Sequence, residues 1–152
     1  MNSQPINEEN KFDILKLDNQ LCFSLYVCSK EIIRKYKTLL EPYGLTYTGY
    51  IIMMALWEED HITIKNLGEK LFLDSGTLTP LLKKLEAQEY IVRNRSKKDE
   101  RNVYISLTKK GKDLRSEALC IPEQLISTLD VDMNEGKQML DQLHKLMKIL
   151  TQ

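Results

Sequence analysis

Apolar residues recur every three or four positions over most of the chain, which is the spacing of helices with one buried face. Outside the middle third we expect four helices, over about residues 14–40, 46–57, 109–128 and 133–150. Pro42 and Gly44 should end the first of them, and Pro122 should kink or split the third. The pattern therefore predicts a mainly α-helical protein.

The middle third predicts two shorter helices joined by a tight turn. Leu67 and Leu71 mark the first of these helices. Asp74 and Ser75 can cap the second helix by accepting hydrogen bonds from its free backbone N–H groups. Its buried face is a set of leucines spaced at i, i+3, i+4 and i+7, namely Leu78, Leu81, Leu82 and Leu85. This pattern is typical of a helix-turn-helix.

Two runs rich in β-branched and aromatic residues follow the second helix. They cover residues 90–95 and 102–107 and predict two paired strands, with a polar hairpin tip over residues 96–101. Helix, turn, helix and hairpin in this order form a winged helix-turn-helix, an architecture that reads DNA. We therefore expect a mainly α fold with a small β wing, in which residues 46–108 form the winged helix-turn-helix.

Short hydroxyl and cationic side chains lie on the outer faces of the second helix and on the hairpin. Such side chains at a helix start suit the floor of a major groove, and cations on a hairpin suit DNA phosphates. The candidate DNA-binding residues are Ser75, Thr77, Thr79, Lys83, Lys84, Arg93, Arg95, Lys97, Lys98, Asp99 and Arg101.

The distribution of charge strengthens this hypothesis. The whole chain is neutral, with 22 Lys and Arg against 22 Asp and Glu, which argues against a broad basic surface. Residues 83–115, however, hold 11 cationic and 5 acidic side chains. One cationic region on an otherwise acidic molecule is typical of localised phosphate binding. A solvated charged hairpin is the alternative that charge alone leaves open.

Length and composition set further bounds. The 152 residues fit one domain, and no apolar run approaches the ~20 residues of a membrane span. Three cysteines without metal-type spacing and a polar N-terminus favour a reducing cytoplasm over export. Two histidines are too few for a convincing zinc site, so we expect neither a metal nor another cofactor.

The terminal helices are long for one small core. The last helix carries an apolar stripe at heptad-like spacing, made by Met139, Leu143, Leu146 and Leu150. We expect these helices to form a homodimer, because a two-fold pair of recognition helices can meet successive major grooves of a pseudo-palindromic operator. Packing of the stripe within its own chain is the alternative.

Two groups of motifs resemble a known family. The run LDSGTLTPLLKKLE over residues 73–86, with Asp99-Glu100-Arg101, resembles the MarR family of dimeric bacterial repressors. The run LDNQLCF over residues 17–23, followed by Tyr36 and by Leu45-Thr46-Tyr47, resembles its organic-hydroperoxide repressor (OhrR) branch, which includes SarZ-like regulators. The resemblance implies a single MarR-type domain over residues 1–152, with dimerisation helices at about 14–45 and 109–152.

The resemblance also implies a redox switch. In this branch the cysteine that matches Cys22 is oxidised by organic hydroperoxides, and tyrosines that match Tyr36 and Tyr47 hydrogen-bond its thiolate from the partner subunit. The resemblance further assigns DNA-contacting or wing-orienting roles to Ser75, Thr77, Lys84, Arg93, Asp99 and Arg101. It implies a repressor that leaves its operator when Cys22 is oxidised, rather than an enzyme.

The chemistry of Cys22 is consistent with that role. A thiolate attacks a peroxide, and two phenol donors would stabilise the thiolate form. The resulting sulfenic acid needs a second thiol to become a disulfide. A Cys22–Cys28 bridge is excluded, because six residues span about 9 Å along one helix. Cys120 of the partner and a small cellular thiol remain as alternatives, and Cys28 reads as packing.

Two other functions remain open. A MarR-type regulator can instead respond to a small molecule bound beneath its long helices. A thiol peroxidase is also conceivable, although the chain has no Cys-x-x-Cys motif. A plain buried cysteine, without redox chemistry, is the alternative for Cys22 that periodicity alone favours.

Overall fold

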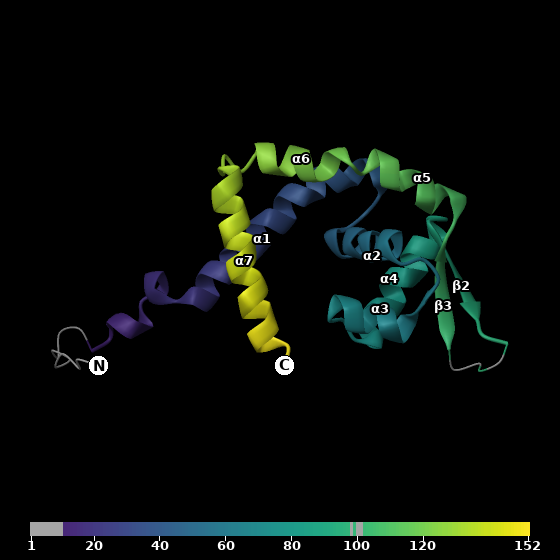
Figure 1. The fold of residues 1–152 in the computed structure, drawn as a ribbon, viewed down its shortest axis with the longest axis horizontal. Coiled ribbons are helices and arrows are strands. Elements are labelled where there is room, and N and C mark those ends of the chain that lie inside the picture. The colour runs from purple at the N-terminus through teal and green to yellow at the C-terminus, as the bar shows by residue number, and fades with distance from the viewer. Residues whose placement is uncertain (1–10, 98, 100–101) are drawn as a thin grey trace.

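A computed structural model describes residues 11–97, 99 and 102–152. A winged helical module lies at one end of the molecule, and long helices extend from it to the other end, where the N-terminal segment lies (Figure 1). The α-helices are α1 (Leu21–Leu40), α2 (Tyr47–Glu58), α3 (Ile64–Leu71), α4 (Ser75–Ala87), α5 (Lys109–Glu117), α6 (Cys120–Ser127) and α7 (Met133–Leu150). The strands are β1 (Ile62–Thr63), β2 (Ile91–Arg95) and β3 (Val103–Leu107).

The predicted fold class, a mainly α fold with a small β wing, is confirmed, and three details differ from the sequence pattern. The first long helix begins only at Leu21, because two 3₁₀ turns, η2 (Asp13–Leu15) and η3 (Leu17–Asn19), precede it. A third 3₁₀ turn, η4 (Glu41–Tyr43), follows it. A short strand, β1, also joins the wing, and two residues are too few for a periodic signal.

The predicted helix over 109–128 is split, as Pro122 suggested. The break lies at residues 118–119, and Pro122 occupies the first turn of α6. A proline is tolerated in a first turn because the backbone N–H that it lacks has no partner within the helix there. The residue before it, Ile121, donates instead to the Ala118 carbonyl oxygen at 3.1 Å.

Two side-chain caps and one unusual backbone conformation shape the helix-turn-helix. Thr63 caps α3 by accepting from the Asn66 N–H at 3.1 Å, and Asp74 caps α4. Phe72 ends α3 in the left-handed region, with φ 55°. Gly68 lets the turn close over α3, since an ideal Cβ on it would lie 2.6 Å from the Leu73 carbonyl oxygen. The two helices are therefore held at a fixed angle.

The sheet is antiparallel with the strand order β1-β3-β2. Ile91 pairs with Leu107 at the base of the wing, and Arg95 pairs with Val103 toward its tip. The core lies beneath this base and between α2, α3 and α4. Its most deeply buried side chains are Leu40, Ile52, Met53, Leu56, Leu67, Leu78, Leu82, Leu85, Ile91, Ile105 and Ile121.

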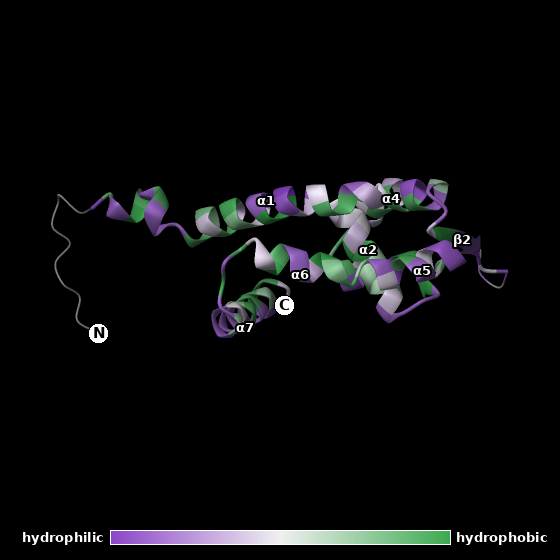
Figure 2. Cartoon of the chain, turned by 90° about the horizontal axis from the view of Figure 1, so that it is seen from above, coloured by the Kyte–Doolittle hydropathy of each residue, from purple (hydrophilic) through white to green (hydrophobic). Residues whose placement is uncertain are grey.

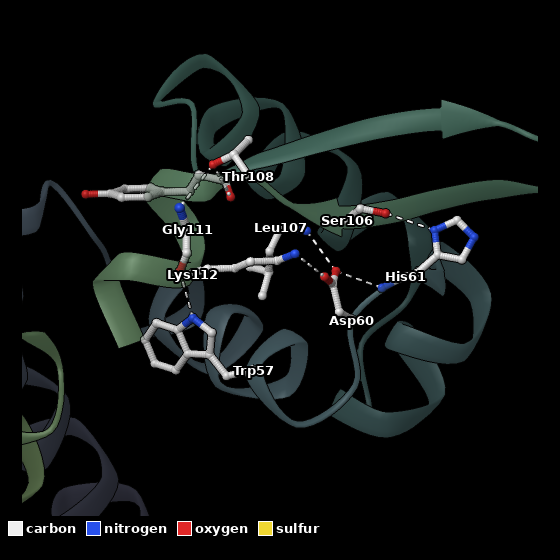
Figure 3. A network of polar contacts seen from close by, with 9 residues as sticks. Trp57, Asp60, His61, Ser106, Leu107, Thr108, Gly111 and Lys112 are labelled. Carbon is white, nitrogen blue, oxygen red and sulfur yellow. Dashed lines mark hydrogen bonds and ion pairs between the residues drawn. The ribbon is translucent and has the colours of Figure 1, made fainter. Parts of the chain in front are cut away.

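A polar network joins α2, the base of the wing and α5 (Figure 3). The Trp57 indole Nε1 donates to the Gly111 carbonyl oxygen at 2.9 Å, and the Gly111 N–H donates to the Thr108 hydroxyl at 3.0 Å. The Asp60 carboxylate accepts from the backbone N–H groups of Leu107 and His61, both at 2.8 Å. The network therefore anchors α5 to the winged module.

The long helices expose large apolar side chains. Helix α7 has no buried residue, and Met139, Leu143 and Leu150 of its predicted stripe are all exposed. Both hydrophobic and hydrophilic residues lie along this helix (Figure 2). Leu146, the fourth member of the stripe, is half-buried. The stripe therefore packs little against its own chain, which favours an interface between chains, and the homodimer stays a prediction. Within the described residues, no helix is long and apolar enough to cross a membrane.

We predict that Gly111→Ala strongly destabilises the protein. An ideal Cβ on Gly111 would clash with the Tyr90 carbonyl oxygen and lie 3.1 Å from its carbon, so α5 would have to move away from the wing. Overpacking of this kind costs about 1–3 kcal/mol, measured as a loss of free energy of unfolding in urea. Gly136→Ala is the matched control, because its Cβ would meet Val131 at 3.8 Å. An equal loss in both variants would contradict the prediction.

Candidate DNA interface and thiol site

The start of α4 presents short polar side chains on its exposed face. The Asp74 carboxylate accepts from the Thr77 N–H at 2.8 Å and from the Thr77 hydroxyl at 2.9 Å. These hydrogen bonds hold the pKa of Asp74 below its usual value. The Thr79 hydroxyl donates to the Ser75 carbonyl oxygen at 2.7 Å. Both threonine hydroxyls therefore donate their hydrogen bonds within the start of α4, and they present acceptor lone pairs and methyl groups outward.

The cations predicted for this helix and for the wing point to solvent. Lys83 and Lys84 are exposed, opposite the buried face of α4. Arg95 and Lys97 are exposed on the wing. Ser75 and Thr77 are exposed as well, and Thr79 is half-buried. The structure thus brings the predicted hydroxyls and lysines onto one helix and two predicted cations onto the neighbouring hairpin.

Arg93 differs from the other predicted cations because it is paired. Its guanidinium donates to the Glu86 carboxylate at 2.6 and 2.8 Å, and its backbone N–H donates to the same carboxylate at 3.1 Å. The hydrogen bond from Arg93 holds the pKa of Glu86 below its usual value. This pair connects α4 to β2. Of the two roles expected for Arg93, contact with DNA and orientation of the wing, it favours orientation of the wing.

The tip of the wing is described only in part. The Asn102 N–H donates to the Asp99 carbonyl oxygen, and the Ser96 N–H donates to the Asn102 carbonyl oxygen, both at 2.9 Å. Asp99 is half-buried. Lys98 and Arg101, two of the predicted DNA-binding residues, lie outside the described residues.

A groove between the helix-turn-helix and the wing was not predicted. Its volume is about 790 Å³, and Lys65, Phe72, Ser75, Thr79 and Asn102 contribute to its walls. Phe72 is 64% exposed. No local pattern in the sequence indicates this groove, because its walls come from α3, α4 and β3, which meet only in the folded chain. These side chains extend the candidate DNA interface beyond α4.

Cys22 and its predicted partners lie far apart within one chain. Cys22 is exposed at the second position of α1, whereas Tyr36 lies fourteen residues later in the same helix. At the rise of an α-helix this separation is about 21 Å. Tyr47 is at the start of α2, beside Tyr36. One chain therefore does not assemble the predicted thiol site.

The tyrosines themselves form a tight cluster. The ring centroids of Tyr36 and Tyr47 are 4.8 Å apart, and those of Tyr36 and Tyr50 are 5.8 Å apart. Burial and the two neighbouring phenols raise the pKa of Tyr36 to about 12. Tyr36 therefore keeps its proton and stays a hydrogen-bond donor at neutral pH. Tyr50 was not predicted, since its place on the buried face of α2 resembles that of an ordinary core residue.

Cys120 lies next to this cluster. It is half-buried at the start of α6, packs against the core and donates to the Glu117 carbonyl oxygen at 3.3 Å. Burial, Tyr47 and the nearby Cys120 together raise the pKa of Tyr50. Cys28, which the sequence placed in packing, is exposed on α1. Only Cys120 of the three thiols therefore accompanies the tyrosines.

Tyr47 also lines a second groove. It has a volume of about 590 Å³ and is bounded by α1 and by the turn into α2. Apolar side chains include Ile33 and Leu45, and the cations Lys30, Arg34 and Lys37 line its edge. We call it the α1–α2 groove.

Comparison with known proteins identifies relatives over most of the chain. Residues 34–118 match the family model "Transcriptional regulator SarA/Rot". The HTH-type transcriptional regulator SarZ of Staphylococcus epidermidis is 50% identical over 127 residues, which cover 84% of this chain and 86% of SarZ. The organic hydroperoxide resistance transcriptional regulator of Bacillus subtilis is 46% identical over 144 residues, covering 95% of this chain and 98% of the relative.

Solved structures of AbfR from Staphylococcus epidermidis share the fold. Reduced AbfR bound to DNA is 34% identical with a TM-score of 0.76, and the match covers 93% of this chain and 99% of AbfR. A disulfide-formed AbfR matches with a TM-score of 0.66 at 34% identity, over 96% of this chain and 100% of AbfR.

We predict that Glu86 and Arg93 stabilise the fold as a pair. Glu86→Gln should lower the free energy of unfolding at pH 7 by about 0.5–1 kcal/mol, because both side chains are partly exposed. Since folding lowers the Glu86 pKa, this stabilisation is complete above pH 4.5 and is lost as the pH falls below that value. Urea unfolding across pH 7 to 4 measures both effects.

The control for this pair is Glu69→Gln. Glu69 is exposed and lies 4.0 Å from Lys65, so its replacement should leave stability almost unchanged. A Glu86→Gln loss that persists in an Arg93→Gln background would show that the two side chains are not coupled.

Proposed function

This chain belongs to the MarR family of transcriptional regulators, in the branch of SarZ and the organic-hydroperoxide repressors, and we propose that it is a cytoplasmic, dimeric repressor whose operator release follows oxidation of Cys22. It is a DNA-binding regulator by this membership. The observation that carries the redox proposal is the pair of clustered phenols, since Tyr36 and Tyr47 lie with their ring centroids 4.8 Å apart and the raised pKa of Tyr36 keeps its hydroxyl proton available to a thiolate. About 21 Å along α1 divides Cys22 from Tyr36 within one chain, so the site requires two chains.

The DNA interface is proposed to consist of α4 and the wing. Ser75, Thr77 and Thr79 would face base edges in the major groove, while Lys83 and Lys84 would face phosphates. Arg95, Lys97, Lys98 and Arg101 would bring the wing to the neighbouring backbone, and Asp99 would orient its tip. Most described members of this set are exposed, and only Thr79 and Asp99 are half-buried, which supports the proposal.

The dimer is proposed to form through α1, α6 and α7. Exposed apolar side chains gather on these helices, among them Tyr26, Ile33, Ile126, Met139 and Leu150. Burial of such area between two chains stabilises an assembly. A two-fold dimer would present two α4 helices to a pseudo-palindromic operator.

The proposed sensor chemistry takes place where two chains meet. The Cys22 thiolate, held by hydroxyl protons from Tyr36 and Tyr47 of the partner subunit, attacks the outer oxygen of an organic hydroperoxide. An S–O bond forms, the O–O bond breaks, and the alkoxide takes a proton and leaves as an alcohol. Sulfur is oxidised to sulfenic acid and the peroxide is reduced. The protonated state of Tyr36 supports its role as a donor.

A second thiol then condenses with the sulfenic acid, forming a disulfide and releasing water. We propose that this thiol is Cys120 of the partner subunit. In each chain Cys120 accompanies the tyrosine cluster that would receive Cys22 of the other chain. A relative has been observed in a disulfide-formed state. Capture by a low-molecular-weight thiol is the competing outcome.

A second candidate function is release of DNA by a small-molecule ligand. The α1–α2 groove favours it, because an apolar pocket of about 590 Å³ edged by cations suits an amphipathic anion. Loss of DNA affinity on adding such an anion to reduced protein, without thiol oxidation, would favour this function over the redox switch.

We predict that Cys22→Ser abolishes the peroxide response. Treatment with cumene hydroperoxide should lower the operator affinity of the unmodified protein at least about tenfold, equivalent to ~1.4 kcal/mol. The reduced Cys22→Ser variant should bind DNA normally and show no change on treatment. Cys28→Ser is the matched control and should respond fully, and fluorescence anisotropy measures both. Peroxide-driven release that persists in Cys22→Ser would refute the sensor assignment.

We predict that oxidation produces a covalent dimer through Cys120. On a non-reducing gel the peroxide-treated protein should migrate as a dimer, and Cys120→Ser should abolish this band while Cys28→Ser retains it. Intact-mass measurement detects the alternative, a monomer carrying a small thiol. That adduct, formed equally with and without Cys120 in the presence of the small thiol, would overturn the prediction.

We predict a steep salt dependence of operator binding. Each phosphate contact releases counterions, so Lys84→Ala should reduce the slope of log affinity against log salt by about 1. Arg93→Ala should lower affinity without changing this slope, because the Arg93 charge is already paired with Glu86. Equal changes of slope in the two variants would show that Arg93 contacts phosphate.

A further inference from the structure

The N-terminal segment before α1 is ordered but has few contacts with its own chain. Residues 12–19, which we call the strap, form the turns η2 and η3 at the end of α1 farthest from the winged module (Figure 1). Asn19 Nδ2 donates to the Asp13 carbonyl oxygen at 2.7 Å, and Lys16 pairs with Asp13 at 2.7 Å. Gln20 Nε2 also donates to the Ile14 carbonyl oxygen. These bonds fix the shape of the strap from within.

The strap exposes an apolar surface. Phe12, Ile14, Leu15 and Leu17 are exposed by 68, 74, 72 and 59%. Four large apolar side chains on one short, internally hydrogen-bonded segment are not explained by the packing of this chain. Such a patch indicates a contact with another surface.

The α1–α2 groove is the complementary surface at the opposite end of α1. Its lining is mostly apolar and includes Ile33 and Leu45, with the cations Lys30, Arg34 and Lys37 and the single carboxylate of Glu41. The strap carries two carboxylates and one ammonium group in residues 12–19. Both surfaces are therefore largely apolar, and their net charges are opposite, negative on the strap and positive on the groove.

The register of the proposed dimer brings the two surfaces together. Placing Cys22 against Tyr36 of a second copy runs the two α1 helices in opposite directions, so position i of one chain faces position 58 − i of the other. This register holds within α1, where Leu21 faces position 37. Leu17 and Ile14 precede α1 in the turns η3 and η2, so the strap lies beyond position 37 of the other chain, in the direction of η4. Glu41 and Gly44 both line the α1–α2 groove.

We propose that in the dimer the strap of each chain docks into the α1–α2 groove of a second copy. This inference rests on the proposed contact between Cys22 and Tyr36 of the partner subunit. It gives the groove an occupant in the chain's own sequence. Docking would also affect the proposed thiol site, because a docked strap covers Tyr47 of the second copy and fixes the start of its own α1, where Cys22 lies.

Cross-linking of two engineered thiols tests the contact. In a chain whose three cysteines are replaced by serine, one copy carries Leu17→Cys and a differently tagged copy carries Glu41→Cys. Co-expressed heterodimers are treated with a short bis-maleimide and separated on a denaturing gel. We expect a cross-linked heterodimer. Homodimers of either variant should not cross-link, because α1, 20 residues or about 30 Å long, separates their thiols.

The control pairs Leu17→Cys with Lys65→Cys, since Lys65 is exposed on α3 in the winged module. This pair should give no heterodimer band. Absence of the Leu17–Glu41 product from a preparation that light scattering shows to be dimeric would overturn the proposal. Because this chain lacks Cys22, the assay is independent of the redox response, which the Cys22→Ser experiment tests separately.

A second measurement uses the strength of the dimer. Leu15→Ser combined with Leu17→Ser should raise the dimer dissociation constant at least tenfold, because both side chains lose their apolar contact with the groove. Phe72→Ser removes a similarly exposed side chain from the winged module and should leave the constant unchanged. Equal constants for the strap variant and the unmodified protein, measured by sedimentation, would contradict docking.

Discussion

The arrangement of the molecule depends on the close approach of α5 to the base of the wing at Gly111. No side chain fits between this residue and the Tyr90 carbonyl group. The Trp57 indole holds the Gly111 carbonyl from the side of α2, and the Thr108 hydroxyl holds its N–H from the side of β3. Helix α5 is thereby joined to the DNA-reading module through short contacts, which leave little room for independent movement.

The Asp60 carboxylate reinforces this joint. Burial raises its pKa, but backbone hydrogen bonds from Leu107 and His61, together with the Lys112 ammonium group, lower it below its usual value overall. The charged carboxylate therefore holds the end of α2, the end of β3 and α5 together at neutral pH. A displacement of α5 in the proposed switch would therefore act on the wing through these contacts.

The sequence was most informative where a residue acts through its own helix or strand. The Asp74 cap, the leucine face of α4 and the two strands of the wing all follow from local spacing, and the structure has them. The Pro122 signal was also correct, because a proline restricts its own backbone. The split itself fell at residues 118–119, since the first turn of a helix tolerates proline.

Features that depend on distant partners were not predictable. The Glu86–Arg93 pair joins a helix to a strand, and the position of Tyr50 beside Cys120 needs α2 and α6 to meet. The strap was read as the beginning of a helix because its apolar residues continue the spacing of α1. For the thiol site, periodicity alone favoured a buried cysteine, and only the motif shared with a family indicated a sensor.

In the proposed dimer, the thiol lies on α1, away from the recognition helix α4. Oxidation can then change the placement of the two chains without changing the DNA-contacting side chains. Two recognition helices engage a palindrome only when they are about 34 Å apart, one turn of DNA. A disulfide between Cys22 and the partner's Cys120 would change how two chains are placed, without altering any side chain of α4. The Gly111 joint would carry that change to the wing. Loss of simultaneous engagement would remove the gain from the second half-site, so in the proposed dimer a small movement at the chain interface would be sufficient for release.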